Sequence, residues 1–144
     1  MNVGWLNPHH QFTRGPIEDL HIDLLWSLCR VTVMDTRGIH RCEFCSGDPV
    51  LSAYLHHGER RRLGTGEVRT FSPSGMIFAA PDLVFHYMRD HGYLPPRAFL
   101  GALEATSSPD LTGYTSRLDT LGLPWKLNPL LSEEPRSILA SKLK

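Results

Sequence analysis

The feature that most constrains this chain is a set of two cysteines and two histidines with the spacing of metal ligands. Cys42 and Cys45 are separated by two residues, and His86 and His91 are separated by four. Thiolate and imidazole together suit zinc, and both spacings occur in structural zinc sites. The two pairs lie far apart in the sequence, so the fold must bring them together in a way that a short zinc finger does not.

The second pair raises a geometric question about the fourth ligand. On an ideal helix, residues five apart differ by about 140° in direction, so His86 and His91 share a face only if the last turn is tightened. If it is not tightened, His40 is the replacement, because a residue two positions before a cysteine points to the same side of an extended strand. The predicted metal ligands are Cys42, Cys45, His86 and His91, with His40 as the alternative to His91.

The number of protein ligands decides what such a site can do. Four ligands would close the site and make it structural, whereas three would leave a position for water, as in catalytic zinc sites. In an open site the candidate proton carriers are Glu43, Glu67 and the spare histidine, His40 or His91. For Glu67, the solvent face of a strand is the simpler interpretation. A redox role for the cysteine pair is disfavoured, because no strand–helix–strand pattern surrounds it.

The patterning along the chain predicts an α+β fold. Apolar residues at helical spacing predict a helix over residues 17–29, in which Cys29 is a core residue. Prolines at first-turn positions predict two more helices, one over 81–91 that stops at a glycine and one that opens at 95–96. Strands are predicted at 31–34, 39–42, 66–71 and 76–79, the last two forming a hairpin through a turn at 72–75, with a short helix or loop over 48–65.

The composition changes after residue 105, where Thr, Ser, Pro, Gly and isolated leucines dominate. We expect residues 1–105 to form a single zinc-binding domain and residues 106–144 to be an extension that is flexible or depends on a partner. Residues 137–144 fit a small basic amphipathic helix. The predicted architecture is a small antiparallel sheet or hairpins, with a Cys-x-x-Cys zinc knuckle packed on two to three helices and an irregular C-terminal tail.

Charge and composition exclude several classes of protein. Fifteen basic residues balance fifteen acidic ones, which argues against a bulk nucleic-acid or membrane-surface binder. The run at 59–62 (ERRR) has no interleaved aromatic residues, so a solvated loop is favoured over a phosphate site. No apolar run approaches the roughly 18–20 residues that span a bilayer, and the N-terminus lacks a signal-peptide pattern. Three cysteines are too few for a secreted disulfide scaffold, so a cytoplasmic location is expected.

Histidine is unusually frequent, with eight in the chain. It is the side chain most often used for metal binding and proton transfer near neutral pH. For the adjacent pairs His9–His10 and His56–His57, however, the simpler interpretation is that they are surface residues.

Three stretches occur in a characteristic order: residues 38–45 (GIHRCEFC), 64–68 (GTGEV) and 78–99 (FAAPDLVFHYMRDHGYLPPRAF). Together with the opening at residues 4–15, they resemble a family of small bacterial proteins of unassigned function. The resemblance covers roughly residues 1–105, and its long helix motif is its most specific part. It implies a bacterial, cytoplasmic single domain, and it implies no reaction.

Two functions are compatible with these observations. In the first, a zinc ion pins the 42–45 knuckle to the helix at 81–91, and the surface built on it binds a protein partner. This is the favoured hypothesis, because a metal supplements the limited core of a small domain. In the second, the same metal serves a small hydrolase or lyase that acts on a small molecule. Neither function requires a membrane or a nucleic acid.

Overall fold

A computed structural model describes residues 1–35, 38–45, 53–106 and 111–131. Its elements confirm the α+β class. In this part of the chain no helix has the length and the apolar character needed to cross a bilayer. The elements follow in the order α1 (Asp19–Leu28), β1 (Val31–Val33), β2 (Ala53–His56), β3 (Glu59–Arg62), β4 (Glu67–Phe71), β5 (Ile77–Pro81), α2 (Val84–His91), α3 (Arg97–Thr106), α4 (Leu111–Thr120) and β6 (Trp125–Leu127).

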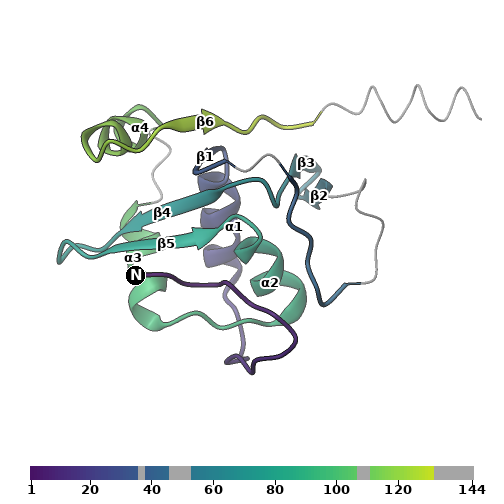
Figure 1. The fold of residues 1–144 in the computed structure, drawn as a ribbon. Coiled ribbons are helices and arrows are strands. Elements are labelled where there is room, and N and C mark those ends of the chain that lie inside the picture. The colour runs from purple at the N-terminus through teal and green to yellow at the C-terminus, as the bar shows by residue number, and fades with distance from the viewer. Residues whose placement is uncertain (36–37, 46–52, 107–110, 132–144) are drawn as a thin grey trace, which may run out of the picture.

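The main sheet is antiparallel and has the strand order β5-β4-β1-β6 (Figure 1). Its β4–β5 hairpin confirms the hairpin predicted at 66–79, because the strands pair in register through the predicted turn. Strand β1 agrees with the prediction at 31–34 and contacts β4 through the pair Val33 and Glu67. The sheet therefore joins segments that are far apart in the sequence.

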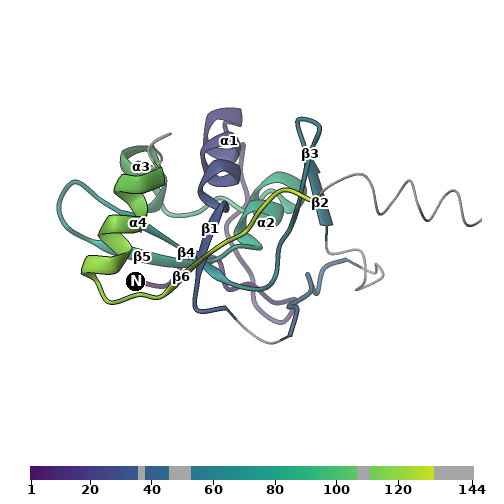
Figure 2. The same cartoon turned by 90° about the horizontal axis from the view of Figure 1, so that it is seen from above.

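The core lies between this sheet and the helices on one of its sides. Helix α3 packs on β4 and helix α1 packs on both α3 and α2, and Figure 2 shows these three helices on the same side of β4 and β5. The rings of Phe78 and Phe99 meet edge to face at 5.9 Å in this layer. Cys29 is fully buried, as predicted for a core residue. Side chains with no exposed surface include Leu25, Val31, Val68, Phe78, Phe99 and Leu103.

Residues 53–62 form a second hairpin, β2–β3, and the prediction of a helix or loop over 48–65 is wrong for this part. The two turn residues, His57 and Gly58, have φ angles of 49° and 79°, which is the conformation of the tight turns that match strand twist. The predicted solvated loop at 59–62 is also wrong, because Arg61 is buried. Its guanidinium donates to the carbonyl oxygens of Trp26 and Asn128. Residues 46–52 lie outside the described residues.

Two further boundaries differ from the predictions. Residues 39–42 form no strand, although the backbone N–H of His40 donates to the carbonyl of Gly64 at 2.7 Å. Helix α2 begins at Val84 and not at Pro81, because Pro81 still belongs to β5 and pairs with Glu67. The third predicted helix is confirmed as α3, which follows the two prolines directly.

Part of the chain after residue 105 packs against the rest of the molecule. Helix α4 buries Leu118 completely, and β6 pairs with all of β1. Beyond β6, the backbone N–H of Asn128 donates to the carbonyl of Arg30, and that of Leu131 donates to the carbonyl of Arg60. The predicted helix at 137–144 lies outside the described residues.

Candidate metal centre

The cysteine pair lies on a tight turn that is held by the backbone. The N–H of Cys45 donates to the carbonyl of Cys42 at 3.3 Å, and the N–H of His40, two residues before Cys42, donates to the carbonyl of Gly64. Gly64 has a φ of 100°, and a Cβ atom there would lie 2.2 Å from the carbonyl oxygen of His40. Only glycine allows this close approach, so the backbone just before the knuckle packs directly against the backbone of Gly64.

The two histidines come from opposite ends of helix α2, and the way this helix ends brings them together. Gly92 is in the left-handed conformation, and its N–H donates to the carbonyl of Tyr87. This bond links residues five apart, so the last turn of the helix is wider than an α-helical turn. The tightened turn that the sequence offered as a way to bring the two histidines together is not present in α2. With the wider turn, the Nε2 atoms of His86 and His91 lie 3.2 Å apart.

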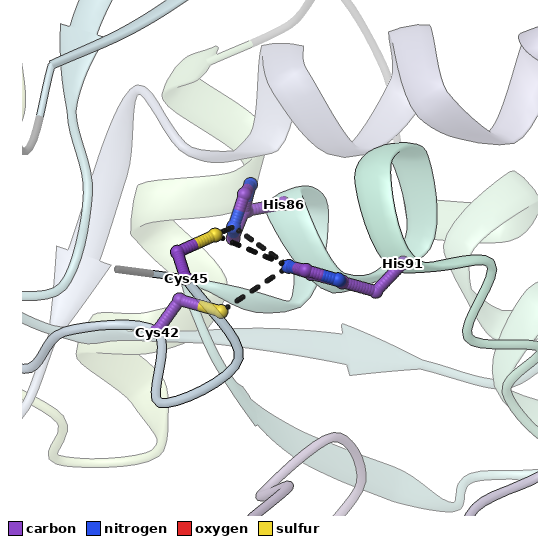
Figure 3. Close-up of side chains that lie close together, drawn as sticks. All are labelled: Cys42, Cys45, His86 and His91. Atoms are coloured by element: carbon purple, nitrogen blue, oxygen red, sulfur yellow. Dashed lines mark hydrogen bonds between the residues drawn. The ribbon is translucent and has the colours of Figure 1, made fainter. Parts of the chain in front are cut away.

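The four side chains converge on one point, as Figure 3 shows. The Nε2 atom of His91 lies 3.3 Å from the Sγ atom of Cys42 and 3.4 Å from that of Cys45. The Nε2 atom of His86 lies 3.3 Å from the Sγ atom of Cys45. All four ligand atoms lie within 4.8 Å of one another. His91 therefore completes this cluster, and His40 is not part of it.

The distances and the donor types fit a tetrahedral metal ion. Tetrahedral zinc, with bonds of about 2.3 Å to sulfur and 2.0–2.1 Å to nitrogen, has ligand–ligand edges of about 3.3–3.8 Å. The four measured edges of 3.2–3.4 Å agree with these values to within a few tenths of an ångström. A tetrahedral ion held by both sulfurs and both imidazole nitrogens would have no open position.

An aspartate that the sequence analysis did not single out orients one of the histidines. Asp90 Oδ2 accepts a hydrogen bond from His86 Nδ1 at 2.7 Å, which leaves the lone pair of Nε2 directed at the thiols. Arg89 donates to both oxygens of this carboxylate. Burial raises the pKa of Asp90, but the hydrogen bonds from Arg89 and His86 outweigh it and hold that pKa below its usual range. The signal was available, because residues four apart share a helix face.

The protonation states suit a metal that replaces protons. Burial raises the pKa of the Cys42 thiol to about 11, partly offset by the backbone N–H of Phe44. Burial also lowers the pKa of His86, against the influence of Asp90. Near neutral pH the metal-free protein therefore holds a neutral thiol and a neutral imidazole here. A metal ion binds the thiolate and the neutral imidazole, so binding releases protons.

Aromatic rings flank the two histidines of the cluster, whereas Cys45 is exposed. The ring of Phe44 lies 5.3 Å from that of His91, and the ring of Tyr54 lies 4.8 Å from that of His86. Burial raises the pKa of both Tyr54 and Tyr87 to about 12. Aromatic side chains of this kind limit the access of water to the histidine side of a metal site and support these ligands.

The three candidate proton carriers lie outside the cluster. His40 and Glu43 line a cavity of about 290 Å³ that also includes Tyr87 and the buried Asp82. Glu67 lies on β4, where its carboxylate pairs with Arg69 at 2.9 Å. The structure thus brings the four predicted ligands together and leaves Glu67 in an ion pair.

A family model described as a domain of unknown function (DUF7919) matches residues 1–104. The matched segment contains all four residues of the cluster and ends before helix α4. No curated protein and no solved structure matches the chain.

Proposed function

Because this chain belongs to the DUF7919 family, whose function is unknown, we propose from the geometry of the cluster that it holds a zinc ion in a closed structural site. The domain then acts in the bacterial cytoplasm as an accessory module that binds a protein partner. One observation carries the proposal: two sulfurs and two nitrogens lie within 4.8 Å of one another, and four of the six distances between them are 3.2–3.4 Å, close to the edges of a zinc tetrahedron.

A bound zinc ion would join two segments that are far apart in the sequence, the knuckle and helix α2. The knuckle is a short turn on which Cys45 is exposed. Helix α2 is anchored in the core through residues such as Phe85 and Met88. The metal transfers the rigidity of the helix to the knuckle, and structural zinc contributes directly to folding free energy.

The closed coordination supports a binding role over a catalytic one. A hydrolase or lyase needs an open position for water or substrate on its metal, and four protein ligands leave none. The ordered surface around the knuckle is what the metal provides, and a surface of this kind suits a protein partner.

The cavity beside the knuckle favours a second candidate, a small metal-dependent enzyme. It is lined by His40 and Glu43, which would carry protons for a small-molecule substrate. This function requires that Cys42, Cys45 and His86 hold the metal without His91, so that the fourth position is open to water or substrate.

The test is the metal content of the purified protein by elemental mass spectrometry, repeated on His86→Ala, His91→Ala and His40→Ala. The closed site predicts one zinc per chain, with zinc lost from the first two variants and retained in His40→Ala, which is the matched control. Zinc that needs His86 but tolerates loss of His91 would support the open site and the enzyme. Protein without stoichiometric metal would contradict both functions.

A further inference from the structure

A second group of metal-binding side chains lies on the β2–β3 turn and on helix α1. One carboxylate oxygen, Oδ1 of Asp23, lies 2.7 Å from His56 Nε2 and 3.0 Å from His57 Nε2. The three ligand atoms lie within 4.8 Å of one another. The sequence alone indicated only surface residues at this histidine pair, because Asp23 comes from a distant element.

The turn directs both histidines to the same side. Successive side chains in a strand point to opposite faces, so an adjacent pair does not normally share one ligand. His57 instead has a φ of 49°, and the two imidazole rings lie 4.1 Å apart. A left-handed conformation in a residue other than glycine costs roughly 1–2 kcal/mol, and residues held in this way cluster at functional sites.

The histidine that is nearer to the core is held in place by its neighbours. The ring of His56 packs against those of Trp26 and Phe85, at 5.5 Å and 5.2 Å, and its side chain is 11% exposed. The side chains of His57 and Asp23 are 72% and 49% exposed. One ligand is thus fixed, and the other two face solvent.

The open side of the cluster borders a cleft of about 540 Å³. The walls of this cleft come from α1, from the β2–β3 hairpin and from residues 127–130, and include Arg30 and Leu127. A metal ion bound to three protein atoms keeps at least one further position for water or a small anion. That position would face the cleft.

We propose that Asp23, His56 and His57 form a second metal site, which takes a divalent cation of the zinc, cobalt or nickel type. Imidazole nitrogen suits these metals, and zinc also accepts carboxylate oxygen. The two contacts, at 2.7 Å and 3.0 Å, are shorter than the roughly 3.3 Å edges of such a site, so metal binding requires the exposed His57 and Asp23 side chains to move outward. This site is independent of the cysteines and goes beyond the structural role proposed for the Cys/His cluster.

The other adjacent histidine pair provides a natural comparison. Asn7 Oδ1 accepts the backbone N–H of His9 and contacts Nδ1 of His10, both at 2.9 Å. The oxygen here belongs to a neutral amide, and this pair forms no metal-binding group among the described residues. A substitution at His10 therefore controls for non-specific binding to surface histidines.

The experiment starts from protein loaded with a single equivalent of zinc, titrates it with Co²⁺ and follows the visible absorption, with the bound metal counted after dialysis. We expect one further equivalent of Co²⁺, with weak bands and no near-ultraviolet thiolate charge-transfer band, because the site has no sulfur. Asp23→Asn and His57→Asn should each weaken this binding at least about tenfold, and His10→Asn should leave it unchanged. Asparagine at position 57 keeps a residue that tolerates the left-handed conformation, so the turn is preserved.

Three results would overturn the proposal. The first is no uptake of a second equivalent at millimolar Co²⁺, which would mean that Asp23 only forms ion pairs with the two histidines. The second is uptake that is unchanged in Asp23→Asn and His57→Asn but lost in His10→Asn. The third is a cobalt spectrum with thiolate charge transfer that persists in both variants, which would place the ion at the cysteines.

Discussion

The closed Cys/His cluster (Cys42, Cys45, His86 and His91) and the open Asp23 cluster (Asp23, His56 and His57) use histidine in opposite ways. In the first, two imidazoles and two thiols supply four ligand atoms, and aromatic rings flank the histidines. In the second, two imidazoles and one carboxylate leave part of the sphere open to a cleft. The number of ligands and their burial, more than the presence of histidine, therefore distinguish a site that stabilises a fold from one that can exchange a ligand.

Both clusters depend on a local departure from regular backbone. Gly92 ends α2 in the left-handed conformation and lets two histidines five apart in the sequence meet. His57 adopts a similar conformation in a hairpin turn and lets two adjacent histidines meet. Glycine takes this conformation without strain, whereas histidine does not. The strained backbone conformation is therefore that of His57, in the open cluster.

The two clusters should differ most in how much a bound metal contributes to the stability of the fold. Stripping metal with a strong chelator should lower the melting temperature by on the order of 10 °C or more, because structural zinc contributes to the folding free energy. Asp23→Asn should show the same drop, since the closed cluster is intact in it. Circular dichroism melts before and after chelation measure this. A melt that chelation leaves unchanged would remove the structural role of the closed cluster.

A pH titration tests the scaffold of the closed cluster. Asp82 precedes α2, and its Oδ1 accepts the N–H of Gly64, the residue against which the backbone just before the knuckle packs. Burial raises the pKa of this carboxyl to about 7, despite backbone N–H bonds from the 64–66 loop. The folded state therefore keeps a proton that the unfolded state loses from about pH 4, so the contribution of Asp82 to stability falls as the pH rises from about 4 to 7.

The matched variant for this titration is Asp82→Asn, which resembles the protonated carboxyl. Its free energy of unfolding, relative to that of the unaltered protein, should rise between pH 4 and 7 by on the order of a few kcal/mol. Urea denaturation at several pH values measures this difference. A difference that stays constant over the range would show that Asp82 does not titrate there.

A smaller effect on zinc affinity is expected for Asp90, and Asp23 provides the comparison because both carboxylates contact histidine. Asp90→Asn should weaken zinc binding at the closed cluster by about 10- to 100-fold, because the carboxylate orients His86. Asp23→Asn is the matched control and should leave this affinity unchanged. Competition with a chromophoric chelator gives both values. Equal affinities in the two variants would mean that Asp90 pairs with Arg89 and does not support the metal.

The smallest effect concerns the open cluster without its metal. The hydrogen bonds from His56 lower the pKa of Asp23, so these contacts weaken as the pH falls through that lowered value. Exposed pairs contribute little, so Asp23→Asn without added metal should shift the melting temperature by no more than about 2–4 °C, the change that 1 kcal/mol produces. Calorimetry at neutral pH measures the shift. A much larger loss would make Asp23 a structural anchor and would weaken the comparison.

The sequence predicted those parts of the molecule whose signals are local. The turn at 72–75 between apolar strands identified the β4–β5 hairpin, and ligand spacing identified the four residues that meet in the Cys/His cluster. The β2–β3 hairpin was missed because every residue of 59–62 is charged, and the buried Arg61 depends on acceptors from distant segments. The turn of His57 and Gly58 was the available signal.

Contacts between distant residues could not be predicted in this way. Asp23 meets the two histidines only because α1 packs beside the β2–β3 hairpin, and no spacing rule relates residue 23 to residue 56. The pairing of β6 with β1 is similar, because three residues after a helix carry no information about their partner. Asp90 was within reach of local reasoning, since it lies one helical turn from His86.

The pairing of β6 with β1 has a consequence for anyone who shortens the protein. A fragment that ends near residue 105 retains the metal ligands but loses the strand that covers the outer edge of β1. Unpaired backbone groups at a sheet edge recruit other chains. Such a fragment would present the apolar Val31 and Val33 beside an open edge, and its first failure would be self-association, even with the metal in place.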